Sequence, residues 1–200
     1  MKDDDTRKKL ETAKLLDAVK EGDLRLVRKA ILNGANLNGN NDVTPLGYAI
    51  QKKDRAMVRF LLTQGADVNK PHLDQNPLIL AIQTQNAEVT EELLKKGALA
   101  NESIGIKSPI DKYQIMVKSP LIIAVETGAF EVAQTLIKYG ADPMKFIWQN
   151  ENAFVTAADC NRGPEWIKML KKNIQRPITR QHVEAAKRTL KEVRQRRNEG

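Results

Sequence analysis

The sequence predicts an all-α fold made of about five helix–turn–helix copies that stack on one another. Three similar strings support this prediction: "TPLGYAI" at 44–50, "NPLILAI" at 76–82 and "SPLIIAV" at 119–125. Gly-Ala pairs begin at 34, 65, 97 and 140, so the successive spacings are 31, 32 and 43 residues. A period of this length is typical of a repeat solenoid, in which each copy buries its apolar face against its neighbours.

The same local chemistry defines the two helices of each copy. A capping residue begins the first helix, and in three copies proline follows it at the first helical position, where no hydrogen bond is lost. These capping residues are Thr44, Asn76, Ser119 and Asn152. The helical pattern breaks about eight residues later, near Gly22, Lys53, Gln85, Gly128 and Asn161. A second helix follows, with apolar residues such as Met57 and Leu61 at helical spacing, and Gly65 or its equivalent ends it in a left-handed conformation.

These strings resemble the ankyrin repeat, whose signature runs Thr-Pro-Leu-His, then alanine-like positions, Leu-Leu and Gly-Ala-Asp-Val-Asn. The resemblance covers roughly residues 12–172, with a weaker fifth copy at 152–170. The family's histidine, which bonds the preceding threonine, is replaced here by Gly47, Ile79, Ile122 and Val155. We therefore expect that bond to be absent and the stack to be less stable than a consensus one.

Charge separates a neutral body from a basic C-terminal end. Residues 1–161 hold 21 Lys and Arg against 21 Asp and Glu, whereas residues 162–200 hold 12 against 4. We expect a charged N-terminal end at 1–11, a repeat stack at 12–173 with a long finger at 101–118, and a basic C-terminal helix at 174–200. An apolar stripe along that helix predicts a cap for the last copy, and its basic face either solvates the cap or binds an acidic partner.

Composition excludes several classes of protein. The 200 residues include 41% hydrophobic residues, enough for a core, but no apolar run is long enough to cross a bilayer. The N-terminus has no hydrophobic region, so we expect no secretory signal. A single cysteine, Cys160, allows no internal disulfide. We expect a cytoplasmic location, or delivery into a host cell if the protein is an effector.

No arrangement of residues typical of catalysis is evident. The two histidines, His72 and His182, are more than one hundred residues apart, and no metal-ligand spacing or phosphate-binding glycine loop occurs. We expect Cys160 to be a half-buried thiol rather than a reactive one. The sequence therefore predicts a protein that is not an enzyme and has no cofactor and no metal.

The ankyrin resemblance implies that partners bind the concave face, formed by the first helices, and the finger loops. His72 is placed at a finger tip. Tyr48 is as consistent with packing between copies as with partner contact, and the long finger either folds back on the stack or meets a partner. The candidate partner-binding residues are Asn41, Val43, Tyr48, Gln51, Lys52, Leu73, Gln75, Gln83, Thr84, Tyr113, Ile115, Glu126 and Thr127.

Two functions follow as hypotheses. The first is a non-catalytic scaffold, a monomer that binds another protein, and its irregular repeats resemble those of small bacterial effectors that act on host proteins. The alternative is an adaptor whose basic C-terminal helix docks nucleic acid or an anionic membrane surface. The anion-binding candidates for that alternative are Arg188, Arg194, Arg196 and Arg197.

Overall fold

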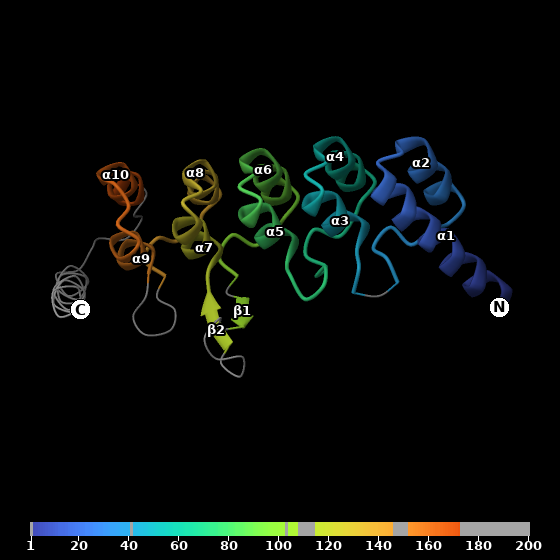
Figure 1. The fold of residues 1–200 in the computed structure, drawn as a ribbon, viewed down its shortest axis with the longest axis horizontal. Helices are drawn as coiled ribbons and strands as arrows, with labels where there is room; N and C mark the ends of the chain where they lie inside the picture. Colours follow the sequence, from blue (N-terminus) through green and yellow to red (C-terminus); the bar gives the residue numbers. More distant parts are fainter. Residues whose placement is uncertain (1, 41, 103, 108–114, 146–151, 173–200) are drawn as a thin grey trace. The chain divides into compact units, whose positions relative to one another are not determined.

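The computed structural model describes residues 2–40, 42–102, 104–107, 115–145 and 152–172. The chain divides into two compact units, here called the N-terminal unit (Met1–Leu99) and the C-terminal unit (Ala100–Gly200). The predicted basic helix at 174–200 lies outside the described residues. Within them the helices form five successive pairs, so the predicted all-α repeat solenoid is confirmed (Figure 1).

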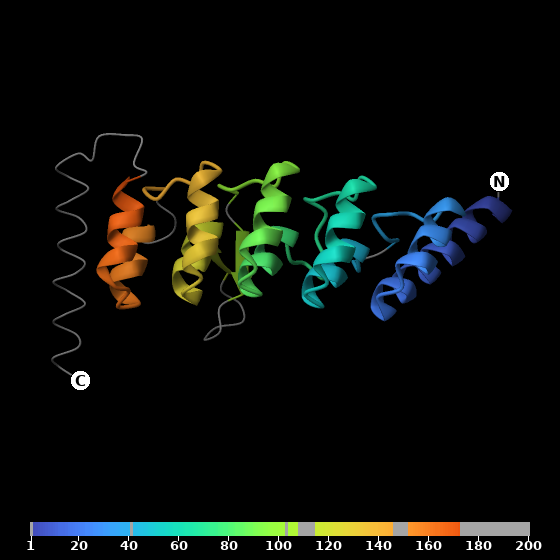
Figure 2. The same ribbon diagram turned by 90° about the horizontal axis from the view of Figure 1, so that it is seen from above.

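The N-terminal unit contains three of these pairs. Helices α1, α3 and α5 pack side by side in one layer, and each packs against the helix that follows it, as both ribbon views show (Figures 1 and 2). We call α1, α3 and α5 the inner helices and α2, α4 and α6 the outer helices. The pairs are α1 (Lys2–Glu21) with α2 (Leu24–Leu32), α3 (Pro45–Gln51) with α4 (Arg55–Thr63), and α5 (Pro77–Gln83) with α6 (Ala87–Lys95).

The C-terminal unit contains two more pairs and a β-hairpin. Helix α7 (Pro120–Thr127) packs on α8 (Phe130–Lys138) and on α9 (Ala153–Asp159), which pairs with α10 (Pro164–Lys172). The hairpin joins β1 (Ile104–Lys107) and β2 (Ile115–Lys118), antiparallel with Ile104 opposite Lys118. It lies on the side of α7 away from α8 (Figure 1). The hairpin lies in the finger expected at 101–118, but its two strands were not predicted.

The local chemistry of the helix ends is confirmed. Thr44 Oγ1 accepts a hydrogen bond from the Gly47 N–H at 3.1 Å, and Asn76, Ser119 and Asn152 cap α5, α7 and α9 in the same way. Each predicted break is a residue with positive φ, namely Gly22, Lys53, Gln85, Gly128 and Asn161. At Gly65, φ is 92° and a Cβ would meet nothing within 4 Å, so backbone conformation rather than crowding favours glycine there.

The core of each unit lies between its helices. In the N-terminal unit the largest fully buried side chains are Leu15, Leu46, Ile50, Met57, Leu61, Leu78, Ile82 and Leu93. In the C-terminal unit they are Leu121, Ile122, Leu136 and Leu170. Aliphatic residues at helical spacing therefore fill the space between successive helices, as the repeat pattern predicts.

Helix α1 includes most of the predicted charged end at 1–11. Helix α1 begins at Lys2, so the expected boundary at residue 11 falls inside a helix of 20 residues. Asp4 and Asp5 lie in its first turn, where negative charge interacts favourably with the helix dipole. Lys9 Nζ lies 2.7 Å from Asp5 Oδ2, a pairing that supports the exposed turn. Glu11 and Thr12 are already buried.

Candidate protein-binding surface

A buried histidine joins two neighbouring copies of the N-terminal unit. His72 is 0% exposed, and its Nδ1 accepts a hydrogen bond from the Thr44 backbone N–H at 2.9 Å. A Cβ placed on Gly47 would lie 2.2 Å from both Cβ and Cγ of His72. The ring therefore fills the space that a side chain at position 47 would occupy.

This contact corrects two expectations from the sequence. His72 was expected at an exposed finger tip, but its ring is buried beneath the tip. The bond between a histidine and the threonine before Pro45 was expected to be absent, but His72 supplies it from 28 residues further along the chain. At the positions corresponding to Gly47 in the next two copies, Ile79 and Ile122 are buried in the core.

The environment of His72 favours the neutral ring. Burial lowers the pKa of His72, because transfer of an imidazolium from water into the core is unfavourable. The Thr44 N–H can donate only to an unprotonated Nδ1, so the proton of the neutral ring lies on Nε2. Among the described residues, Nε2 has no hydrogen-bond partner. The ring of Tyr48 lies edge-on to His72, with centroids 6.2 Å apart.

A tight turn covers this histidine. The backbone N–H of His72 donates to Gln75 O at 2.8 Å, and the Gln75 N–H donates to His72 O at 3.0 Å. Leu73 and Asp74, between them, have φ values of 50° and 65°. The Leu73 N–H donates to Asp42 O at 2.7 Å, which ties the turn to the neighbouring finger. We call residues 72–75 the His72–Gln75 turn; its Leu73, Asp74 and Gln75 side chains are exposed.

The C-terminal ends of the inner helices form a second part of the surface. Because α3 packs against both α1 and α5, the helix ends follow one another across the unit. Tyr48, Val43 and Thr84 are half-buried, and Lys20 Nζ lies 5.8 Å from the centre of the Tyr48 ring. The exposed residues at these ends are Lys20, Glu21, Gln51, Lys52 and Gln83.

Comparison with known families agrees with this geometry. The family model for ankyrin repeats in three copies matches residues 15–104, and the model for a single ankyrin repeat matches residues 118–145. The chain belongs to the ankyrin repeat family. Ankyrin repeats are protein–protein interaction scaffolds, and this chain is such a scaffold. A comparison with curated proteins found no match.

The ankyrin pattern extends in the structure beyond the matched residues. The pair of α9 and α10 follows residue 145, and α9 has the same capped start as the earlier inner helices. Arg162, between these two helices, donates from Nε to Val125 O at 2.8 Å and from Nη2 to Glu126 O. Cys160, two residues before Arg162, is half-buried as expected.

The remaining candidate residues of this ankyrin protein are divided between described and undescribed positions. Glu126 is half-buried and forms an ion pair with Lys118, and Thr127 is exposed with its hydroxyl donating to Ile123 O at 2.8 Å. For Ile115, in β2, only the backbone is described. The candidates outside the described residues are Asn41, Tyr113, Arg188, Arg194, Arg196 and Arg197.

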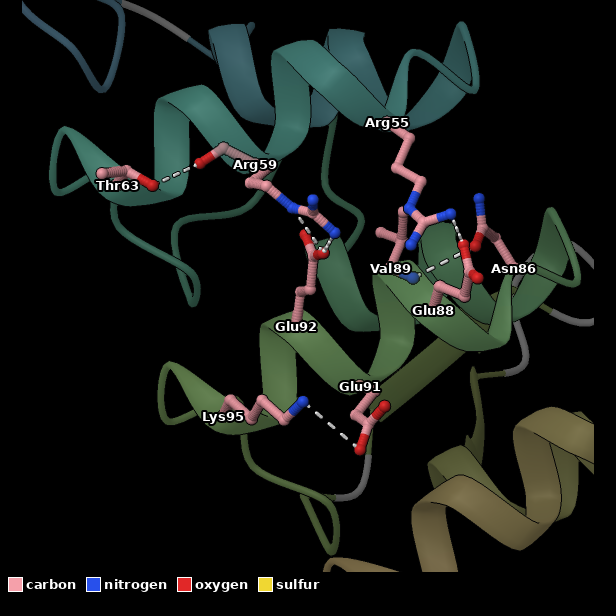
Figure 3. A network of polar contacts seen from close by, with 9 residues as sticks. All are labelled: Arg55, Arg59, Thr63, Asn86, Glu88, Val89, Glu91, Glu92 and Lys95. Atoms are coloured by element: carbon pink, nitrogen blue, oxygen red, sulfur yellow. Dashed lines mark hydrogen bonds and ion pairs between the residues drawn. The ribbon is translucent and has the colours of Figure 1, made fainter.

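Ion pairs between outer helices are a feature that sequence reasoning missed. Arg59 of α4 donates from Nε and Nη2 to Glu92 Oε1 of α6 at 2.9 and 2.6 Å, and Arg55 pairs with Glu88 (Figure 3). The two residues of each ion pair are 33 positions apart in the sequence, one more than the spacing between the Gly-Ala pairs at 65 and 97. The repeat period was therefore the sequence signal that could have predicted these ion pairs. Exposed pairs of this kind each contribute little to stability.

The structure also bears on the other predicted properties. No helix in the described part of the chain is both long enough and apolar enough to span a membrane. Over the same ranges, no three or more His, Cys, Asp or Glu side chains gather in a way that could hold a metal ion.

Proposed function

We propose that the chain binds a partner protein through the inner surface of its N-terminal unit. The inner surface is defined here as the exposed ends of the inner helices together with the His72–Gln75 turn. Its exposed residues are Lys20, Glu21, Gln51, Lys52, Leu73, Asp74, Gln75 and Gln83. The observation that carries the proposal is their position: they follow one another on successive copies, while the core that stabilises the unit lies beneath them.

The chemistry of the inner surface favours a protein over a polyanion. Lys20 and Lys52 are accompanied by Glu21 and by the amides of Gln51 and Gln83, so the charges are mixed. A surface that binds nucleic acid gains its affinity from many phosphate contacts, which requires an excess of basic side chains. Mixed polar side chains beside an exposed leucine are instead typical of a protein interface. We propose that binding, without catalysis, is the activity.

A pair of matched double variants tests this proposal. The partner is first captured by the full-length wild-type chain, identified and purified, and its affinity is then measured. Lys52→Glu with Gln83→Glu alters the inner surface, whereas Lys29→Glu with Gln64→Glu makes the same charge change on outer helices. All four positions lie at C-terminal ends of helices: Lys52 and Gln64 are C-caps, Gln83 is the last residue of α5, and Lys29 is in the last turn of α2. The total charge change near helix C-termini is therefore the same in both variants.

We expect the inner-surface variant to bind the partner at least about tenfold more weakly, a loss of about 1.4 kcal/mol, and the control to bind as the wild type does. Circular dichroism melting verifies that both variants are folded. Equal affinities for the two variants would contradict the proposal, as would the failure of the wild-type chain to retain any specific partner.

The C-terminal unit supplies further candidate contacts. Thr127 is exposed, but Glu126 has a structural part, since it pairs with Lys118 and its carbonyl accepts a bond from Arg162. The finger that contains the hairpin stays a second candidate contact, separate from the helix ends. Its candidate residues are Ile115, in β2, and Tyr113, which lies between the two strands in the sequence. Replacement of residues 103–116 by a short polar linker tests it: weaker binding by a folded chain would support it, and unchanged binding would contradict it.

The alternative function rests on the uneven charge of the chain. Residues 162–200 hold 12 basic and 4 acidic side chains, which favours an acidic protein, nucleic acid or an anionic membrane as partner for that segment. A change of Arg188, Arg194, Arg196 and Arg197 to glutamine tests it. Binding that weakens steeply with salt in the wild type, and less in this variant, would support the alternative. Action as a bacterial effector, a cytoplasmic location and the monomeric state stay predictions.

A further inference from the structure

We propose that Leu73 is the anchor of this interface: its side chain inserts into an apolar pocket of the partner protein, and basic groups of the partner surround that pocket. This inference rests on the function proposed above and deepens it. It names the residue that anchors the interface and the kind of partner surface that this residue contacts. The evidence is the backbone conformation of the His72–Gln75 turn, the exposure of Leu73, the hydrogen bonds that hold the turn, and its charged residues.

The backbone of the turn does not suit leucine. Leu73 and Asp74 have φ values of 50° and 65°, so both central residues of this two-residue turn are left-handed. Such turns favour Asn, Asp or Gly, because a larger side chain crowds its own backbone when φ is positive. Asp74 is a residue of the favoured kind, but Leu73 is not. Leucine therefore raises the free energy of the folded chain relative to asparagine at this position.

The side chain of Leu73 gains little from folding in return. It is 53% exposed, so much of its apolar surface stays in water. A residue that strains the backbone and remains exposed is not explained by the stability of the fold. Backbone strain of this kind is concentrated at binding and switch sites, where the bound state compensates for it.

The turn is held rigidly from beneath. The buried His72 ring bonds to Thr44, the paired His72–Gln75 backbone bonds close the turn, and the Leu73 N–H is fixed to Asp42 O. The side chain is therefore presented on a backbone that is already ordered. An anchor on an ordered backbone loses less conformational entropy on binding than one on a flexible loop.

The charges beside Leu73 define the partner surface. Asp74 is the next residue, and Asp42 supplies the carbonyl that fixes the turn; both side chains are exposed. Exposed carboxylates on the residue after Leu73 and on the residue bonded to its backbone complement an apolar pocket with lysine or arginine at its edge. A purely apolar pocket without basic groups would leave these carboxylates desolvated and unpaired, which is unfavourable.

The experiment compares Leu73→Asn with Leu99→Asn in the full chain. Leu99 is an ideal control because it is also 53% exposed in the same unit and is not among the residues with positive φ. For each variant we measure the melting temperature and the affinity for the purified partner used to test the inner surface. We expect Leu73→Asn to melt at the wild-type temperature or above and to bind at least about tenfold more weakly. We expect Leu99→Asn to bind as the wild type does.

A third variant, Asp74→Asn, tests the basic edge of the pocket, because asparagine keeps the left-handed conformation and removes the charge. We expect slower association and a smaller dependence of affinity on salt. Unchanged affinity of Leu73→Asn, with binding still sensitive to Lys52→Glu and Gln83→Glu, would overturn this inference and leave the proposed function standing. A lower melting temperature of Leu73→Asn would also overturn it, since leucine would then serve the fold. A wild-type chain without any partner would overturn both.

Discussion

The two units tie neighbouring copies together in opposite ways. In the N-terminal unit, the neutral imidazole of His72 accepts a hydrogen bond from Thr44 at the start of helix α3. In the C-terminal unit, the guanidinium of Arg162 donates to Val125 and Glu126 carbonyls at the end of helix α7. Each group matches the helix end it meets, since helices begin with unpaired N–H groups and end with unpaired carbonyls.

This difference shows how an ankyrin copy can lose a residue of the family signature. Gly47 replaces the histidine of the signature, yet the bond to the threonine is retained because the next copy supplies a ring. The pattern within one copy therefore does not decide whether a stabilising bond is present. The two ties also differ in charge, so they respond differently to substitution and to pH.

The largest expected effect is the loss of the histidine tie. His72→Ala removes a fully buried ring and leaves the Thr44 N–H without its acceptor, so we expect the chain to lose about 3 kcal/mol of unfolding free energy. Chemical denaturation measures this loss. A loss below about 1 kcal/mol, the size of a typical hydrogen bond alone, would show that the ring does not pack as described.

A companion variant tests the same contact from the other side. Gly47→Ala places a Cβ where the His72 ring lies, so we expect about 2 kcal/mol of destabilisation even though alanine favours helix. If Gly47→Ala were stabilising, the ring would have to lie elsewhere. A double exchange, Gly47→His with His72→Gly, should recover part of the stability that His72→Gly alone loses, because the ring returns to the position of the family signature.

The arginine tie should matter less. Arg162→Gln removes two charge-assisted hydrogen bonds to carbonyls from a half-buried side chain, and we expect a loss of about 1.5 kcal/mol. The unfolding free energy of Arg162→Lys should lie between those of Arg162→Gln and the wild type, because one ammonium cannot reproduce the two-nitrogen geometry of the guanidinium. Equal stability of wild type and Arg162→Gln would show that this tie contributes nothing.

The effect that best separates the two ties is the dependence of stability on pH. Because burial lowers the pKa of His72, the unfolded chain binds a proton more readily than the folded chain. Stability from this group is fully present above the unfolded pKa of about 6.5 and falls as pH decreases below it, by at most about 1.4 kcal/mol per pH unit.

Unfolding free energies between pH 7.5 and 5 measure this effect in the wild type and in His72→Gln, with Arg162→Gln as the control. We expect a smaller loss in His72→Gln and a wild-type slope in Arg162→Gln. Parallel profiles for the wild type and His72→Gln would mean that His72 does not titrate on unfolding as described.

The sequence predicts the elements that depend on local chemistry. The caps at Thr44 and Asn76, the breaks at Lys53 and Gln85 and the left-handed Gly65 each follow from one residue and its immediate neighbours. These features determine the helical pairs and thus the fold. The start of α1 was not predicted, because residues 1–11 were expected only as a charged end, although acidic residues favour the first turn of a helix.

The contacts between copies were harder to predict. His72 lies 28 residues from Thr44, and Arg162 lies 37 residues from Val125, so neither contact follows from the pattern of a single copy. The sequence did contain a signal for the contact between His72 and Thr44. One finger contains a histidine, His72, and the copy before it has Gly47 in place of the family's histidine. Gln51, Lys52 and Gln83 could be proposed as surface residues because they occupy equivalent positions in the first helices of successive copies. The strained turn at Leu73 could not be predicted, because its positive φ does not follow from the residue type.

The ring of His72 holds the His72–Gln75 turn against the copy before it. A long-range proton–nitrogen NMR spectrum of the imidazole at neutral pH tests this contact, with His182→Gln used to assign the signals. We expect a single tautomer with Nδ1 unprotonated and Nε2 protonated, and a Thr44 amide proton strongly protected from exchange with water. A ring that averages between both tautomers, with a Thr44 amide that exchanges as fast as in an unfolded chain, would contradict it.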